Sequence, residues 1–248
     1  MWADKVIEAI GPAPEDRFLE IGPGRGILTL RLAPRVGELT AVEIDRDLAA
    51  RLAPELPRNV RLVAGDFLDF DVRPLVTGGP LRVAGNLPYN VSSPILFKLL
   101  TAWRAHGRIA DATLMLQREV ADRLTATPGT GDYGVLAILI QRHADVDRLL
   151  ELPPGAFRPP PKVRSAVVRL RFRPARASVR DEAVFERLVR TLFMQRRKTV
   201  LNALRPLADE RHADPAALLR LSAIDPIRRP ETLQLPELAR LADAFPSR

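Results

Sequence analysis

The chain has 248 residues, 46% of them hydrophobic, so it can bury a full core in one large domain or in a large domain with a small appendage. Its 38 basic residues outnumber its 30 acidic ones, and the net charge of +8 favours a polyanionic partner. The sequence has no cysteine and three widely separated histidines, which excludes disulfides and a thiolate nucleophile and argues against a bound metal.

The start of the chain does not look like a targeting signal. MWADKVIEAIGPAPEDRF lacks the order of basic, apolar and small residues that a secretion signal needs. No apolar run approaches the roughly 18 residues that span a bilayer. We therefore expect a cytoplasmic protein without a membrane partner.

Short β-rich runs alternate with helical stretches over the first half of the chain. The expected strands are 17–22, 39–45, 60–66, 81–86 and 112–117, and the expected helices are 26–36, 46–56, 93–103 and 118–126. This alternation is typical of βαβ units, in which helices cover both faces of a parallel sheet. It predicts a doubly wound, Rossmann-like α/β fold.

The pattern changes after a further expected helix at 134–144. Residues 145–152 and 162–172 are both strand-like, and because no helix separates them, we expect an antiparallel edge of the same sheet. The proline-rich segment 152–163 is predicted to be a stiff, extended connector.

The C-terminal part of the chain has helical periodicity from about residue 178 onward, and Asp214 is a candidate N-cap. The sequence therefore predicts two domains. Residues 1–175 form the α/β domain, and residues 176–248 form a small all-helical domain that binds RNA or another substrate.

A glycine-rich loop, LEIGPGRG, joins the first predicted strand to the first helix. Gly22, Gly24 and Gly26 permit a tight turn and the close approach of a ligand, and the helix N-terminus adds free N–H groups. Ligands of open α/β sheets bind at the carboxyl ends of the strands, where this loop lies.

Acidic residues end the next two predicted strands. Glu43 stands where an acidic side chain accepts both hydroxyls of a ribose. Asp66 can accept a hydrogen bond from the exocyclic amine of an adenine, with Phe67 beside the ring. Either acid alone could equally cap the following helix. Together with the glycine loop, they favour a cofactor that contains adenosine.

The loop also discriminates between two such cofactors. Ile27 occupies the position at which the dinucleotide fingerprint needs its third glycine, and Glu20 adds a negative charge that repels a pyrophosphate and tolerates a cation. We therefore expect S-adenosylmethionine. The candidate cofactor-binding residues are Glu20, Gly22, Gly24, Glu43, Ile44, Asp66, Phe67 and Asn86.

The fourth predicted strand ends in the motif NLPY. The Asn86 side-chain oxygen and the Leu87 carbonyl can each accept one N–H of a base amine, which directs the nitrogen lone pair at a methyl donor. Pro88 fixes the turn, and Tyr89 offers a face on which an extracted base stacks. Asn and Pro are also ordinary turn residues, so the motif alone does not predict a function. Its predicted position beside the glycine loop favours methylation of an amine.

Seven segments together resemble the ribosomal RNA adenine dimethyltransferase family. They occur in the family's order, cover roughly residues 5–205, and read FLEIGPGRGILT, AVEIDRDLAARL, GDFLDF, GNLPYNVSSPIL, MLQREVADRLTATPGTGDYGVLAILIQ, PPGAFRPPPKVRSAVVRL and FMQRRKTVLNAL. The resemblance implies an enzyme that transfers methyl groups from S-adenosylmethionine to two adjacent adenines near the 3′ end of small-subunit ribosomal RNA, during ribosome biogenesis. It also implies that the partner is an assembling small ribosomal subunit.

The resemblance also implies roles for individual residues. Gly22, Gly24 and Glu43 correspond to residues that hold the cofactor, Asp66 to the residue at its adenine, and 86–89 to the motif that holds the target amine. Phe157, in AFRPPPKV, matches a second aromatic residue that packs on the flipped base.

Family members usually carry a basic N-terminal arm with a Gly-Gln-Asn/His-Phe-Leu motif, which closes over the cofactor. Here Met1 and Trp2 already lie inside the segment that resembles the first helix. Without that arm we expect weaker cofactor affinity and slower turnover.

Arginines gather in KVRSAVVRLRFRPARASVR and in QRRK. Each one alone could be a solvated surface residue, but as a set beside a base-flipping site they are expected to contact RNA phosphates. The candidate RNA-binding residues are Arg164, Arg196, Arg197 and Lys198.

Three other functions share parts of this pattern. The large-subunit adenine methylases of the macrolide-resistance type share the cofactor and amine motifs, although PPGAFRPPPKVRSAVVRL and QRRKTVLNAL look closer to the small-subunit group. A ribosome-assembly factor that has lost catalysis would bind cofactor without transferring methyl groups. A nicotinamide dehydrogenase is disfavoured by Ile27. The sequence thus favours a monomeric, metal-independent dimethyltransferase.

Overall fold

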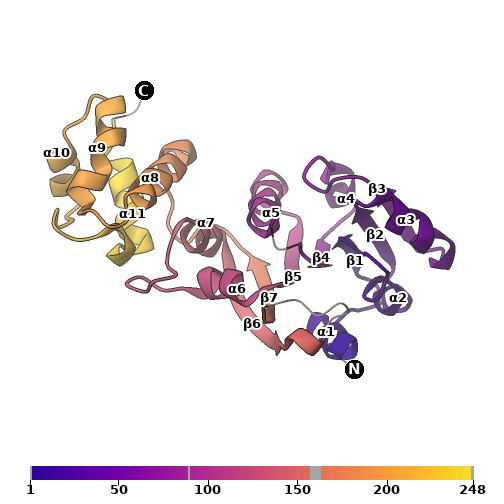
Figure 1. The fold of residues 1–248 in the computed structure, drawn as a ribbon. Helices are drawn as coiled ribbons and strands as arrows, with labels where there is room; N and C mark the ends of the chain where they lie inside the picture. The colour runs from indigo at the N-terminus through magenta and orange to yellow at the C-terminus, as the bar shows by residue number, and fades with distance from the viewer. Residues whose placement is uncertain (1, 89, 157–162, 247–248) are drawn as a thin grey trace. The chain divides into compact units, whose positions relative to one another are not determined.

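A computed structural model describes residues 2–88, 90–156 and 163–246, and it contains one seven-stranded sheet (Figure 1). The strands are β1 (Arg17–Ile21), β2 (Glu38–Glu43), β3 (Val60–Ala64), β4 (Leu81–Asn86), β5 (Ile109–Gln117), β6 (Ala144–Leu152) and β7 (Ser165–Phe172). Their order in the sheet is β3-β2-β1-β4-β5-β7-β6. β1 to β5 are parallel, whereas β7 is antiparallel to both β5 and β6. This confirms the predicted parallel sheet with an antiparallel edge.

The helices largely follow the expected order. They are α1 (Trp2–Ile10), α2 (Thr29–Leu32), α3 (Arg46–Leu52), α4 (Arg73–Thr77), α5 (Ser92–His106), α6 (Arg118–Thr125), α7 (Val135–His143), α8 (Glu182–Met194), α9 (Val200–Glu210), α10 (Pro215–Leu221) and α11 (Leu235–Asp243). Asp214 caps α10, as predicted, by accepting hydrogen bonds from the N–H groups of Ala216 and Ala217. Within the described ranges, no helix is both long enough and apolar enough to cross a membrane.

Two of the expected helices are shorter than predicted. α2 and α3 give way to the 3-10 turns Ala33–Arg35 and Ala53–Glu55, each of which contains a proline near its start, Pro34 or Pro54. Proline has no N–H to continue an α-helical ladder, so the chain tightens there. The connector after β6 also begins with a 3-10 turn, Pro154–Ala156, instead of the expected extended conformation.

Helices cover both faces of the sheet. A buried apolar cluster joins α1 and α2 to one face and includes Ile7, Leu32, Phe18, Ala84 and Val167. α5 packs against β5 and lies on the opposite side of the sheet (Figure 1). This arrangement confirms the doubly wound fold.

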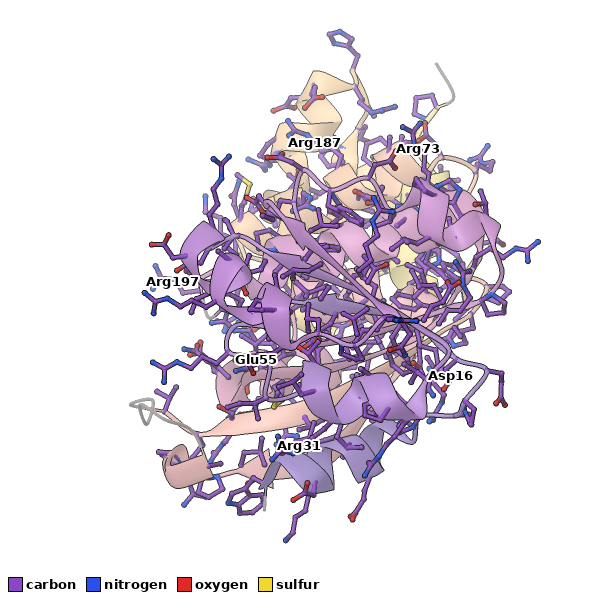
Figure 2. The ribbon with its side chains drawn as sticks, turned by 90° about the vertical axis from the view of Figure 1, so that its right-hand side faces the viewer. Asp16, Arg31, Glu55, Arg73, Arg187 and Arg197 are labelled. Atoms are coloured by element: carbon purple, nitrogen blue, oxygen red, sulfur yellow. The ribbon has the colours of Figure 1, made fainter. Side chains whose placement is uncertain are left out.

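Arginine side chains fix both ends of α1. Arg82 of β4 donates to the carbonyls of Ile10 at 2.7 Å and Gly11 at 2.9 Å, and it pairs with Asp16 at 2.6 Å. Near the start of the helix, Arg31 contacts Asp4 at 3.3 Å. Asp16 and Arg31 are labelled in Figure 2. Cationic donors at a helix C-terminus complement its dipole, so Arg82 stabilises α1.

The chain divides into two compact units. The sheet unit comprises residues 1–121 and 144–173, and the helical unit comprises residues 122–143 and 174–248. The division differs from the expected domains, 1–175 and 176–248, because residues 122–143 group with the C-terminal helices. The reason is that α7 packs against α8 (Figure 1).

A buried arginine joins α7 to the start of α8. Arg142 is 2% exposed, and its guanidinium donates to the carboxylate of Glu182 at 2.7 Å and to the carbonyl of Ala177 at 2.8 Å. It also lies 4.6 Å from the ring centroid of Phe185. A buried charge needs such partners, so these interactions fix α7 within the helical unit.

Candidate active site

The loop after β1 depends on glycines in the left-handed region. Gly22, Gly24 and Gly26 have φ values of +70°, +57° and +74°. A Cβ added to Gly26 would come within 2.4 Å of the Leu52 side chain, whereas one added to Gly24 would meet no atom within 4 Å. A side chain at Gly26 would strain the backbone at this φ and would also displace the end of the Leu52 side chain, whereas Gly24 presents its backbone to open space that a ligand can approach.

The carboxylate of Glu43 ties this loop to the end of β2. Glu43 is 5% exposed, and its Oε2 accepts the Gly24 N–H at 2.8 Å while Oε1 accepts the Asp45 N–H at 3.0 Å. These two hydrogen bonds fix the carboxylate in place. Each oxygen keeps a second lone pair, so it can accept a further hydrogen bond, for example from a ribose hydroxyl. The N-cap of α3 is Asp45 and not Glu43, which removes the alternative role considered for Glu43.

Ile44 follows Glu43 and is 62% exposed. It lies at the carboxyl end of β2, the edge of the sheet at which ligands of this fold class bind. The side chain is therefore available to the apolar face of a ligand bound at Glu43.

Glu20 is a buried acid beneath the glycine loop. It is 1% exposed, and burial raises the pKa of its carboxyl to about 7, with a smaller contribution from the charge of Glu43 and an opposing one from the Thr29 hydroxyl. Among the described residues, Glu20 Oε2 and Thr29 Oγ1 make no hydrogen bond of standard geometry. An unsatisfied buried carboxylate oxygen favours a cationic or donor ligand nearby.

Asp66 lies in a turn directly after β3. Its Oδ1 accepts the Leu68 N–H at 2.8 Å, and its carbonyl accepts the Phe70 N–H at 3.0 Å. No described residue bonds to Oδ2, which remains available to an external donor such as an amine. The expected contact between the Phe67 ring and an adenine is not favoured, because Phe67 is 4% exposed and its ring packs in the interior beneath Lys98.

The NLPY motif forms a compact turn at the end of β4. Asn86 is exposed, whereas Leu87 is 1% exposed and its N–H donates to the Met115 carbonyl at 3.0 Å. The Pro88 carbonyl accepts the Ser92 hydroxyl at 3.0 Å. Leu87 therefore anchors the turn in the core while Asn86 stays accessible. Tyr89 and Phe157, the two expected base-stacking residues, lie outside the described residues.

The glycine loop and the NLPY turn lie next to each other. A Cβ on Gly22 would be 3.7 Å from the Asn86 carbonyl oxygen, and a Cβ on Gly85 would be 2.6 Å from the Ile21 carbonyl oxygen. Because β3, β2, β1 and β4 are adjacent and parallel, their carboxyl ends bring Asp66, Glu43, the loop and Asn86 to one edge of the sheet. This edge can hold a nucleoside beside an amine acceptor site.

The arginines of β7 are less available for RNA than their number suggests. Arg169 donates to the carbonyl of Ile10 at 2.9 Å, Arg171 pairs with Asp147 at 2.5 Å, and Arg173 pairs with Asp145 at 3.1 Å. Arg164, just before the strand, is exposed, and its carbonyl accepts the Arg118 N–H at 3.0 Å.

The QRRK motif lines a hollow of about 520 Å³ in the helical unit. The hollow is lined by Phe193, Met194, Gln195, Arg196, Arg197 and Lys198. Arg196 is engaged within the unit, since it donates to the Gly131 carbonyl at 2.7 Å and lies 3.9 Å from Glu231. Arg197 and Lys198 are exposed, and Figure 2 labels Arg197. These two side chains are therefore better placed than Arg196 to meet an external anion.

Metal ligands do not gather anywhere in the described part of the chain. No group of three or more His, Asp or Glu residues there could hold a metal ion.

Comparison with known proteins gives one consistent family. The family model described as ribosomal RNA adenine dimethylase matches residues 1–239. The ribosomal RNA small subunit methyltransferase A of Aromatoleum aromaticum is 46% identical over 241 residues, covering 96% of this chain and 87% of that protein. The protein of the same name from Chromobacterium violaceum is 45% identical over 240 residues, with coverages of 96% and 88%.

Solved structures share the fold over nearly the whole chain. A dimethyladenosine transferase from Plasmodium falciparum superposes with a TM-score of 0.74 at 24% identity, covering 97% of this chain and 93% of that one. The 23S rRNA methyltransferase ErmE superposes with a TM-score of 0.67 at 25% identity, with coverages of 98% and 96%.

Proposed function

Since the chain belongs to the ribosomal RNA adenine dimethylase family, we propose that it dimethylates the exocyclic amines of two adjacent adenines near the 3′ end of small-subunit ribosomal RNA, with S-adenosylmethionine as methyl donor. The relatives that are 46% and 45% identical to it over 96% of the chain are both named as small-subunit enzymes. Their names favour the small-subunit substrate. We place the reaction in the cytoplasm, on an assembling subunit, with a monomeric and metal-independent enzyme.

The position of Asn86 carries this function. Asn86 is an exposed carboxamide at the end of a central strand, and its backbone lies against the loop of Gly22. An amine held by Asn86 therefore meets a ligand bound at the glycine loop. A turn whose asparagine faced away from that loop would not support methyl transfer.

The residues at the edge of the sheet fit S-adenosylmethionine. When bound, this cofactor supplies an electrophilic methyl group on a positively charged sulfur. The Glu43 carboxylate, fixed by the N–H groups of Gly24 and Asp45, would accept the ribose hydroxyls. Asp66 Oδ2 would accept the adenine amine. Burial raises the pKa of Glu20 to about 7, and a cation bound nearby would favour the ionised form of this carboxyl, whose Oε2 makes no hydrogen bond among the described residues.

The acceptor site has to make a poor nucleophile reactive. The lone pair of an adenine amine is delocalised into the ring, so two acceptors that hold its N–H bonds out of the ring plane favour attack. The Asn86 side-chain oxygen and the Leu87 carbonyl are proposed as these acceptors, and Tyr89 and Phe157 as stacking partners of the base. No strong general base is needed, because the nitrogen becomes acidic as it is alkylated.

Methyl transfer to ribosomal subunits tests this function directly. Undermethylated small subunits are incubated with the protein and methyl-labelled S-adenosylmethionine, in parallel with large subunits. We expect label on adjacent adenines of small-subunit RNA and none on large subunits. Label on large subunits alone would instead support the methylase type of ErmE. Cofactor binding without label on either subunit would support an assembly factor without catalysis and would overturn the proposal.

Arg197 and Lys198 are proposed to contact phosphates of the RNA. Replacing both with glutamine is expected to weaken binding to small-subunit RNA and to flatten the plot of log affinity against log salt by about 1 for each phosphate that is no longer neutralised. The measurement is a binding titration at several salt concentrations.

Two other arginines of the helical unit provide a matched control for that variant. Arg187 pairs with Glu210 at 3.0 Å, and Arg220 lies 3.7 Å from Asp214. The double variant Arg187→Gln/Arg220→Gln removes the same charge but should change the salt slope little. Equal slopes in the two double variants would refute a specific role for Arg197 and Lys198.

A further inference from the structure

Lys98 of α5 holds the turn that follows β3. Its Nζ donates to the Leu68 carbonyl at 2.6 Å and to the Phe70 carbonyl at 2.7 Å, and it lies 5.2 Å from the ring centroid of Phe67. One ammonium group thus contacts three residues of a single turn. A lysine has three N–H donors and suits carbonyls that the irregular backbone of a turn leaves without partners.

The same turn orients Asp66. The Leu68 N–H donates to Asp66 Oδ1 at 2.8 Å, so the position of Leu68 sets the direction of the carboxylate. Lys98 bonds to the carbonyl of that same residue. Lys98 therefore acts on the Asp66 carboxylate through the backbone of Leu68.

The surroundings of Lys98 are only partly polar. Burial lowers the pKa of its ammonium, and the charges of Asp69, Asp66 and Asp71 oppose this shift. Removing the ammonium would leave two carbonyls without donors next to a buried ring, and the turn would have to move to find other partners.

α5 also begins at the acceptor site. The hydroxyl of Ser92, the first residue of α5, donates to the Pro88 carbonyl of the NLPY turn. The helix thus connects the turn proposed to hold the target amine to the turn proposed to hold the cofactor adenine. A rigid helix fixes the distance between these two turns.

We propose that Lys98 is a positioning residue that gives the cofactor site its preference for a 6-aminopurine, by holding the turn in which Asp66 Oδ2 meets the exocyclic amine. This inference rests on the proposed function, because it requires Asp66 to receive the cofactor adenine. Lys98 itself touches neither the cofactor nor the substrate.

Calorimetry with two ligands that differ only at the purine 6-position tests this role. The probes are S-adenosylhomocysteine, with an amine, and its purine riboside analogue, with only a hydrogen at that position. The unmodified protein should bind the adenine compound at least about tenfold more tightly, as expected for one hydrogen bond to a charged acceptor. In Lys98→Met we expect affinity for the adenine compound to fall by about tenfold and affinity for the analogue without the amine to stay the same, so that the preference disappears.

Two further variants separate positioning from folding. Lys98→Arg can still donate to both carbonyls and should keep most of the preference. Lys5→Met removes a lysine that lies 4.8 Å from the centroid of the Trp2 ring in the same unit, and it should leave the preference intact. The thermal unfolding midpoint of each variant shows whether it is folded.

The outcomes distinguish this inference from the proposed function. If the unmodified protein binds neither probe, the proposed cofactor site is wrong. If it binds both equally, Asp66 does not read the amine, and the inference about Lys98 falls as well. If it prefers the adenine compound and Lys98→Met keeps that preference, or loses affinity for both probes equally, only the role of Lys98 is overturned.

Discussion

Replacing Asn86 with alanine is expected to lower kcat for adenine methylation by about 100- to 1,000-fold while S-adenosylmethionine still binds. The side-chain oxygen of Asn86 is one of two acceptors proposed to hold the target amine, whereas the cofactor is proposed to be held chiefly by Glu43, Asp66 and the glycine loop. Single-turnover transfer of labelled methyl groups measures the chemical step, and calorimetry measures cofactor affinity in the same preparation.

Asn90 supplies the matched control for this variant. It is an exposed asparagine four positions further along the chain, after the NLPY motif. Asn90→Ala should methylate at close to the unmodified rate. Turnover of Asn86→Ala within a few-fold of the unmodified protein would show that the carboxamide does not hold the reacting amine.

Replacing Arg142 with methionine is expected to destabilise the helical unit by about 3 kcal/mol, at the lower end of the range for breaking a buried ion pair. The arginine side chain is 2% exposed, but that of Glu182 is 39% exposed, so water can partly solvate the carboxylate left behind. The variant also removes the cation that lies over the Phe185 ring.

Hydrogen exchange is the appropriate measurement for Arg142→Met. Both tryptophans, Trp2 and Trp103, lie in the sheet unit, so intrinsic tryptophan fluorescence reports on the wrong unit. We expect faster exchange in peptides of α7 and α8 and unchanged exchange in β1 and β4. Arg187→Met, which removes an exposed partner of Glu210, is the control and should have an effect below about 1 kcal/mol. Unchanged protection of α8 in Arg142→Met would contradict the assignment.

The sheet can be predicted because its parallel strands are short apolar runs that end in recognisable residues. The predicted strand 81–86 coincides with β4, and β1 differs from its prediction by one residue, because Gly22 takes the left-handed conformation that ends the strand. The sequence does not predict α4, since this helix has only five residues and lies between segments rich in turn-forming residues. It overestimates the lengths of α2 and α3, because periodicity alone does not show where Pro34 and Pro54 tighten the backbone.

The candidate cofactor and amine residues can be found because parallel strands bring their carboxyl ends to one edge. A single rule thus places Gly24, Glu43, Asp66 and Asn86 together. The sequence cannot show that Phe67 is buried, because its neighbour Lys98 comes from a helix about thirty positions away. For the same reason it cannot show that Arg196 bonds to Gly131 and is thereby less available than Arg197.

The helical unit is made from two stretches of chain that are synthesised at different times. α7, with its buried residues Ala137, Ile138, Leu139 and Ile140, is translated before β6 and β7, and its partner α8 is translated after them. A nascent chain that ends within β7 therefore carries an apolar helix with no α8 to cover it. The unit can complete its fold only after the sheet's last strand has been made, and no single cut in the chain separates the two units.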